Sequence, residues 1–146
     1  IKINSTPTRK SFCTSKEVFK SKTSFTKIIS SPTNSAVGFV IETDELTPDT
    51  VTGIYFPKNT TYKVHLLTNY YLGNDFISFS PNGSRFVYKD GCFEGVCGFT
   101  IKETGTLKTI RHFGNVEIEP SNVFVRWISE SNIEYRDGGD VRPATF

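Results

Sequence analysis

Cys92 and Cys97 are the residues whose type and spacing carry the clearest chemical signal in the chain. A Glu-Gly turn between them would let the two thiols face each other across a β-hairpin. A disulfide there closes a very small loop, so chain entropy assigns it only roughly 2 kcal/mol, and its main role would be to fix the hairpin register. Zinc would require further Cys or His ligands at the right spacing. We therefore expect a disulfide and no metal site, with Cys13 left free or joined to another chain.

The two histidines, His65 and His112, are the candidates for a general acid and base. Neither lies beside a nucleophile motif such as G-x-S-x-G, and each falls in a segment with strand-like alternation. We expect no catalytic residue, no cofactor and no enzymatic activity. A small hydrolase is the alternative, and it would bring one histidine within hydrogen-bond reach of a carboxylate in a cleft.

Three aromatic side chains, Tyr70, Tyr71 and Trp127, are possible ligand contacts. Exposed beside amides and carboxylates on a concave patch, they would indicate a secreted or viral β-sandwich that binds a ligand or glycan. A tryptophan in an apolar strand, such as the one predicted at residues 123–128, lies more often in the core than on the surface.

The composition indicates one folded domain. The chain has 146 residues, and its 13 Phe, 6 Tyr and one Trp can fill a core. Its longest apolar or glycine run, Ala36–Ile41, is far shorter than the ~20 residues of a membrane helix. Residues 1–30 hold seven basic residues and one acidic residue, so they carry +6, and the other 116 residues carry −4. Because the positive charges are spread along the segment and offset by an acidic body, we expect no nucleic-acid binding, and the short apolar runs predict no membrane span within the chain.

The N-terminal residues are expected to differ from the rest. Residues 1–14 are rich in Ser and Thr and predict an extended arm, in which Ile1 and Ile3 on one face could add a strand to a neighbouring subunit. Residues 15–146 would form a single β-rich domain. Val18, Phe25 and Ile29 are spaced by seven and four residues, which predicts a helix over residues 15–30 that ends at Ser31-Pro32.

After Pro32 the chain alternates short β-branched and aromatic runs with turn residues, and no internal repeat is evident. These runs predict strands at residues 36–42, 51–56, 61–67, 75–80, 85–89, 98–102, 107–112, 115–119, 123–128 and 133–136. The expected core positions are Phe39, Ile54, Val64, Phe79, Phe99, Ile110 and Val125. The fold class predicted is α+β, mainly β, with one N-terminal helix packed on an antiparallel sheet system that is pilin-like or a β-sandwich.

Residues 75–118 resemble the C-terminal sheet of minor pseudopilins of type II secretion and of their type IV pilus counterparts. The matching features are ISFSPNG at 77–83, the cysteine-flanked CGFTI at 97–101, and KTI at 108–110 leading through Gly114 to VEI at 116–118. The resemblance implies a non-enzymatic subunit of a pilus-like or pseudopilus-like filament, extracellular or periplasmic, with the helix as a remnant of the filament spine. Its partners would be other protein subunits, including further copies of itself. No catalytic residue carries over.

Overall fold

Every regular element that the computed structural model describes is a β-strand. The described residues are 23–43, 50–57, 63–68, 76–94, 96–117 and 125–146. In chain order the strands are β1 (Thr23–Ser30), β2 (Val37–Thr43), β3 (Thr50–Phe56), β4 (Lys63–Leu66), β5 (Ile77–Phe79), β6 (Arg85–Phe93), β7 (Val96–Glu103), β8 (Thr109–Glu117), β9 (Val125–Ser129), β10 (Asn132–Asp137) and β11 (Asp140–Thr145).

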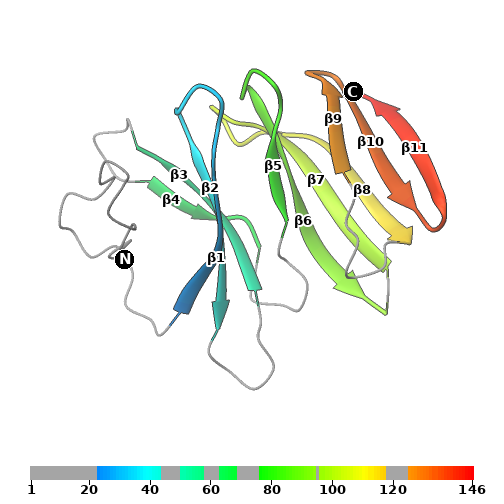
Figure 1. The fold of residues 1–146 in the computed structure, drawn as a ribbon, viewed down its shortest axis with the longest axis horizontal. Helices are drawn as coiled ribbons and strands as arrows, with labels where there is room; N and C mark the ends of the chain where they lie inside the picture. The colour runs from blue at the N-terminus through cyan, green and yellow to red at the C-terminus, as the bar shows by residue number, and fades with distance from the viewer. Residues whose placement is uncertain (1–22, 44–49, 58–62, 69–75, 95, 118–124) are drawn as a thin grey trace.

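The strands form three antiparallel sheets that follow one another along the chain (Figure 1). The strand orders are β1-β2-β3-β4, β5-β6-β7-β8 and β11-β10-β9, so each strand pairs only with its neighbours in sequence. β1 and β2 lie against β5, and β10 lies against β8, so the β5–β8 sheet is the middle layer. Consecutive four-stranded meanders packed in this way are the building plan of β-propeller blades.

The helix expected over residues 15–30 is wrong. Residues 23–30 form strand β1, residues 15–22 lie outside the described part, and no described residue is helical. A bulge between Phe25 and Lys27 places Phe25 and Ile29 on opposite faces of β1, so their helix-like spacing does not mark a single apolar face. The Ser, Thr and Ile residues of this segment favour a strand, and pairing of β1 with β2 decides the outcome. The fold class is therefore all-β rather than α+β.

The predicted strands otherwise coincide with observed ones, with two corrections. The described residues of the segments 107–112 and 115–119 fall mainly in one strand, β8, which passes straight through the expected Phe113-Gly114 turn, and residues 118–119 lie outside the described part. A register shift between Cys97 and Phe99 absorbs the irregularity there. The last strand, β11, was not predicted because it contains Pro143, which an edge strand tolerates.

The structure reveals a repeat that the sequence did not. Ser31, Ser80 and Ser129 lie at the end of the first strand of each sheet, 49 residues apart in both steps. The first two belong to equivalent turns, SPTNS at 31–35 and SPNGS at 80–84. In each turn the backbone of the first serine bonds the residue five positions later, at 2.9 Å, and the serine Oγ accepts that residue's N–H at 3.1 Å. The turn between β9 and β10 is shorter.

Most of the core forms two layers, one on each face of the middle sheet, and Phe39, Ile41 and Val51 are buried on the far face of the first sheet. Towards the β1–β4 sheet, the buried residues are Ala36, Val40, Ile54, Ile77, Phe79, Phe86 and Tyr88. Towards the β9–β11 sheet, they are Val87, Cys97, Phe99, Ile101, Val116, Val125 and Ile133. Of the seven expected core positions, Phe39, Ile54, Phe79, Phe99 and Val125 are buried, whereas Val64 and Ile110 are only half-buried.

Gly53 and Phe39 show how closely the first sheet is packed. They are cross-strand partners, and the Phe39 ring lies where a Cβ at position 53 would be. We predict that Gly53→Ala lowers the free energy of unfolding by about 1–3 kcal/mol, because the ring must move. Gly139→Ala is the matched control, since nothing lies within 4 Å of a Cβ there. Urea denaturation measures both, and equal effects would contradict the prediction.

Candidate functional site

Cys92 and Cys97 are joined by a disulfide at the tip of the β6–β7 hairpin. Their Cα atoms are 4.0 Å apart, and the two residues are direct cross-strand partners. The turn between them places Glu94 at a φ of 49°, in the left-handed region. The pair therefore lies at disulfide distance, as the spacing predicts, and the bond holds the end of a hairpin that belongs to the middle sheet.

We predict that alkylation of the native, unreduced protein leaves Cys92 and Cys97 unlabelled. Replacing both by serine should cost roughly 2 kcal/mol of stability, as expected for a small loop. Intact mass after alkylation, with and without reductant, checks the first statement, and urea denaturation checks the second. Labelling of both cysteines without reductant would show the hairpin to be reduced.

Asp90, Thr100 and His112 form a polar cluster that the sequence did not predict. The Thr100 hydroxyl donates a hydrogen bond to Asp90 Oδ2, and His112 Nδ1 lies 2.8 Å from Thr100 Oγ1 and 3.1 Å from Asp90 Oδ2. Thr100 pairs with His112 across β7 and β8, and a bulge in β6 brings Asp90 beside them. Gly98 makes room, because a Cβ there would collide with Asp90 Oδ1.

The geometry of this cluster differs from that of a catalytic triad. A triad needs the nucleophile on one imidazole nitrogen and the carboxylate on the other. Here the Thr100 hydroxyl and Asp90 carboxylate both face Nδ1, so the hydroxyl is not aligned for activation by Nε2. Burial raises the pKa of the neighbouring Tyr88, the negative charge of Asp90 raises it further, and a hydrogen bond with Thr100 opposes the rise. The cluster holds an exposed histidine beside a carboxylate. The hydrolase alternative required such a contact, so the structure meets this one of its conditions.

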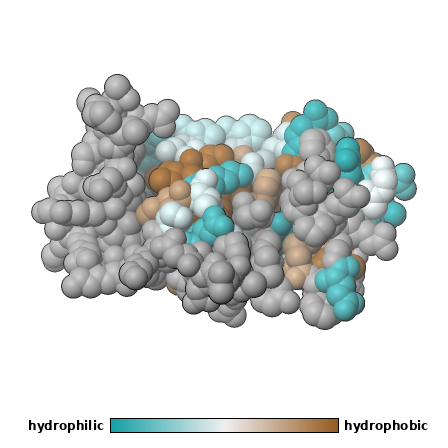
Figure 2. All heavy atoms as spheres, turned by 60° about the horizontal axis from the view of Figure 1, so that its bottom comes forward, coloured by the Kyte–Doolittle hydropathy of each residue, from teal (hydrophilic) through white to brown (hydrophobic). Residues whose placement is uncertain are grey.

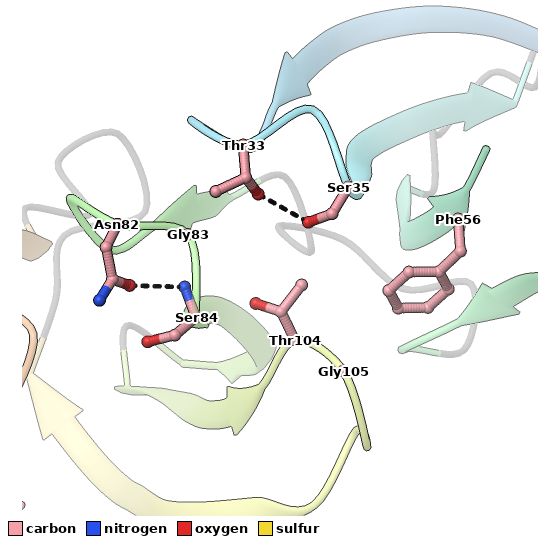
Figure 3. A pocket seen from close by; sticks show the side chains of 8 residues that line it. All are labelled: Thr33, Ser35, Phe56, Asn82, Gly83, Ser84, Thr104 and Gly105. Atoms are coloured by element: carbon pink, nitrogen blue, oxygen red, sulfur yellow. Dashed lines mark hydrogen bonds between the residues drawn. The ribbon is translucent and has the colours of Figure 1, made fainter. Parts of the chain in front are cut away.

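A shallow pocket of about 430 Å³ lies among the turns at one end of the first two sheets (Figure 3). It is lined by Thr33, Ser35, Phe56, Asn82, Gly83, Ser84, Thr104 and Gly105. Much of its hydrogen-bonding capacity is already used, since Thr33 and Ser35 bond each other at 2.8 Å and Asn82 Oδ1 accepts the Ser84 N–H. The Thr104 hydroxyl is buried without a hydrogen-bond partner among the residues described. The pocket is small, and its uncharged lining exposes more apolar than polar surface.

Glu130 connects the turns of the second and third sheets. Its carboxylate accepts the Asn82 N–H at 2.5 Å and the Ser84 hydroxyl at 3.0 Å, while Arg85 Nη1 donates to the Glu130 carbonyl at 2.6 Å. Burial by itself would raise the pKa of the Glu130 carboxyl. The hydrogen bonds from Asn82, Ser80 and Ser84 and the charge of Arg85 together hold this pKa below its ordinary value of 4.5.

We predict that Glu130 makes the joint between the second and third sheets sensitive to acid. Because its pKa is lowered in the folded state, its stabilising contribution is complete well above pH 4.5 and is lost as pH falls through the folded pKa. Glu130→Gln should therefore flatten the fall in urea midpoint between pH 6 and pH 3. Glu94→Gln, at an exposed turn, is the control and should keep the wild-type profile. Identical profiles for wild type and Glu130→Gln would contradict the prediction.

The large aliphatic side chains left exposed lie on the two end faces of the stack. Ile28 is 50% exposed and Leu66 46%, and both lie on the face of the β1–β4 sheet that points away from the middle sheet. Ile128 is 50% exposed and Val141 52%, and they lie on the outward face of the β9–β11 sheet. We call these pairs the front face and the back face. In Figure 2 hydrophobic residues reach the surface beside hydrophilic ones.

Ile28 and Leu66 end a row that crosses the first sheet. The row runs Ile28, Phe39, Gly53 and Leu66, as the strand registers show. Phe39 is buried and Phe25 packs against it edge to face, with ring centroids 5.8 Å apart. Ile41 and Val51 on the same face are also fully buried, so only the margins of the front face, at Ile28 and Leu66, are exposed.

The remaining predicted site residues fall in different places. His65 lies on β4, in a different sheet from the Asp90 cluster, and packs edge to face on Phe56. Trp127 is half-buried against Phe146, and its Nε1 is buried without a partner in the described part, so it belongs to the second core layer rather than to an exposed platform. Tyr70, Tyr71, Cys13, Ile1 and Ile3 lie outside the described residues.

Comparison with known proteins gives no family. No protein-family model, curated protein or solved structure matches the chain. Within the described ranges, no helix is long and apolar enough to span a membrane, and no group of three or more His, Cys, Asp and Glu side chains could hold a metal ion. The features that bear on function are therefore the end faces of the stack, the turn pocket and the Asp90 cluster.

Proposed function

We propose that this protein is a non-enzymatic assembly module of the propeller type, which acts by packing its end sheets against sheets of a protein partner. The observation that supports this proposal is the position of the exposed aliphatic side chains. Ile28 and Leu66 mark one outer face of the stack, and Ile128 and Val141 mark the other. Large aliphatic side chains that gather exposed on one surface are typical of protein interfaces.

The mode of assembly differs from the one that the pilin resemblance implied. A filament subunit of that kind would use an N-terminal helix as its spine, but residues 23–30 form β1. We propose that sheet faces, rather than a helix, mediate the contacts between subunits. The disulfide between Cys92 and Cys97 is compatible with an oxidising compartment, and we propose an extracellular or periplasmic location.

A second candidate function is the binding of a small uncharged ligand at the turn pocket. The hydroxyls of Thr33, Ser35 and Ser84, the amide of Asn82 and the ring of Phe56 are the groups that a sugar hydroxyl face would meet. Most of these hydroxyls already bond one another, so assembly through the end faces has the stronger support.

We predict that the wild-type chain associates with increasing concentration and that polar front faces weaken this association. Ile28→Thr combined with Leu66→Thr should raise the dissociation constant about tenfold or more, because each change removes of the order of 1 kcal/mol of apolar burial while threonine preserves the strand. Lys108→Thr, on an exposed turn of the middle sheet, is the control. Sedimentation equilibrium measures the constants.

Wild type that stays at 16.4 kDa at the highest concentration reached would contradict the assembly function. In that case titration with a monosaccharide panel, followed by chemical shifts of the Phe56 ring, tests the pocket.

A further inference from the structure

We propose that Asn82 is the acceptor of an N-linked glycan on the exposed turn between β5 and β6. Asn82, Gly83 and Ser84 form the acceptor sequence Asn-x-Ser, in which the middle residue is not proline. Asn4 and Asn59 begin sequences of the same kind, but both lie outside the described residues. The inference rests on the extracellular location proposed above, and it goes beyond the assembly function because it assigns a covalent modification.

The side chain of Asn82 is held so that its nitrogen is the free end. Asn82 Oδ1 accepts the Ser84 N–H at 2.8 Å, which fixes the orientation of the amide. Nδ2 has no hydrogen-bond partner among the described residues, and both Asn82 and Ser84 are exposed. In Figure 3 the Asn82 nitrogen lies on the side away from Thr33 and Ser35. The atom that a glycan would use is therefore accessible in the folded chain.

Glycan transfer uses this nitrogen and leaves the bonds of the turn in place. A bond forms between Nδ2 and the anomeric carbon of an oligosaccharide, the bond from that carbon to the diphosphate of a lipid carrier breaks, and Nδ2 loses one proton. The product keeps the amide carbonyl, so Oδ1 can still accept the Ser84 N–H. The Asn82 N–H and the Ser84 hydroxyl, which both donate to Glu130, take no part in the new bond. The folded turn can thus carry the glycan without rearrangement.

The equivalent turn of the first sheet provides an internal control. Asn34 is also exposed and lies in SPTNS at 31–35, the counterpart of SPNGS at 80–84. Two positions after Asn34 stands Ala36 instead of Ser or Thr, so this turn lacks the acceptor sequence. Exposure alone would expose both asparagines to modification, whereas the acceptor sequence selects Asn82.

A glycan on Asn82 would stand at the margin of the turn pocket and away from the end faces. Asn82 is one of the residues that line this pocket. It belongs to the middle sheet, whereas the front face and the back face belong to the first and third sheets. The modification is therefore compatible with assembly through the end faces, and it would hinder the entry of a free sugar into the pocket.

Peptide mapping of the full chain, expressed behind a secretory signal in a cultured eukaryotic cell line, tests the assignment. Trypsin separates Asn34, Asn59 and Asn82, because Lys58 and Lys63 lie between them. We expect a glycopeptide that contains Asn82 and an unmodified peptide that contains Asn34. Detection of the intact glycopeptide, rather than of the aspartate left by enzymatic removal of the glycan, avoids confusion with spontaneous deamidation of the Asn-Gly pair.

Three variants separate the acceptor sequence from other causes. Asn82→Gln and Ser84→Ala should each abolish the glycopeptide. Ser84→Thr keeps the hydroxyl of the acceptor sequence and should retain it. Oxidised Cys92 and Cys97 in each secreted variant show that the β6–β7 hairpin has formed.

The other outcomes overturn the assignment in distinguishable ways. Unmodified Asn82 in secreted protein with oxidised Cys92 and Cys97 would refute the glycan and leave the assembly function standing, because sedimentation of the unglycosylated chain measures assembly. A glycan on Asn82 found only in protein retained inside the cell would show that the folded turn does not tolerate it. Reduced cysteines in the secreted protein would contradict the extracellular location and the assignment together.

Discussion

Burial of the middle sheet on both faces is the constraint on which the rest of the structure depends. Strands β5, β6 and β7 are buried on both faces over most of their length, so Phe86 and Tyr88 lie in one core layer while Val87 and Ile101 lie in the other. A side chain that is fully removed from water contributes of the order of 1.5–3 kcal/mol, so the two layers hold the neighbouring sheets in place. The middle sheet covers one side of each end sheet, and Phe39, Ile41 and Val51 are buried on the other side of the first sheet. Their outer faces carry the apolar side chains that remain, and the turns at one end carry Glu130 and the pocket.

Much of the β-structure could be predicted from the sequence, because strand formation in this chain follows local patterns of residue types. Alternation and turn residues located nearly all strands, and the hairpin spacing located the cysteine pair. The N-terminal helix was wrong because Phe25 and Ile29 have a helix-like spacing, whereas a bulge in β1 places them on opposite faces of a strand, which only the pairing with β2 reveals. The Phe113-Gly114 turn failed for a related reason, since a glycine in a bulge and a glycine in a turn look alike in sequence.

The candidate site was far less predictable, because its members meet through sheet register rather than through sequence spacing. Asp90, Thr100 and His112 are brought together by two cross-strand registers and a bulge, and Gly98 matters only for the space that it leaves. The repeat was hidden because the three serines share no long motif around them, and only the shared hydrogen bonds of Ser31 and Ser80 expose it. Exposure of Ile28 or Val141 likewise depends on which face of a sheet lacks a neighbour. An alternating pattern assigns residues to two faces, but it does not say what covers each face.

The strictly sequential strand order has a consequence for how the chain acquires its structure. Every strand pairs with the one before or after it, through connections that are mostly short, so the contact order of each sheet is low. Low contact order is associated with fast folding, because little loop-closure entropy opposes pairing. Each sheet can thus begin to form as soon as its own strands have left the ribosome, without waiting for the C-terminus. The step that must wait is the docking of one finished sheet on the next, and until then the apolar faces of the middle sheet are open to aggregation.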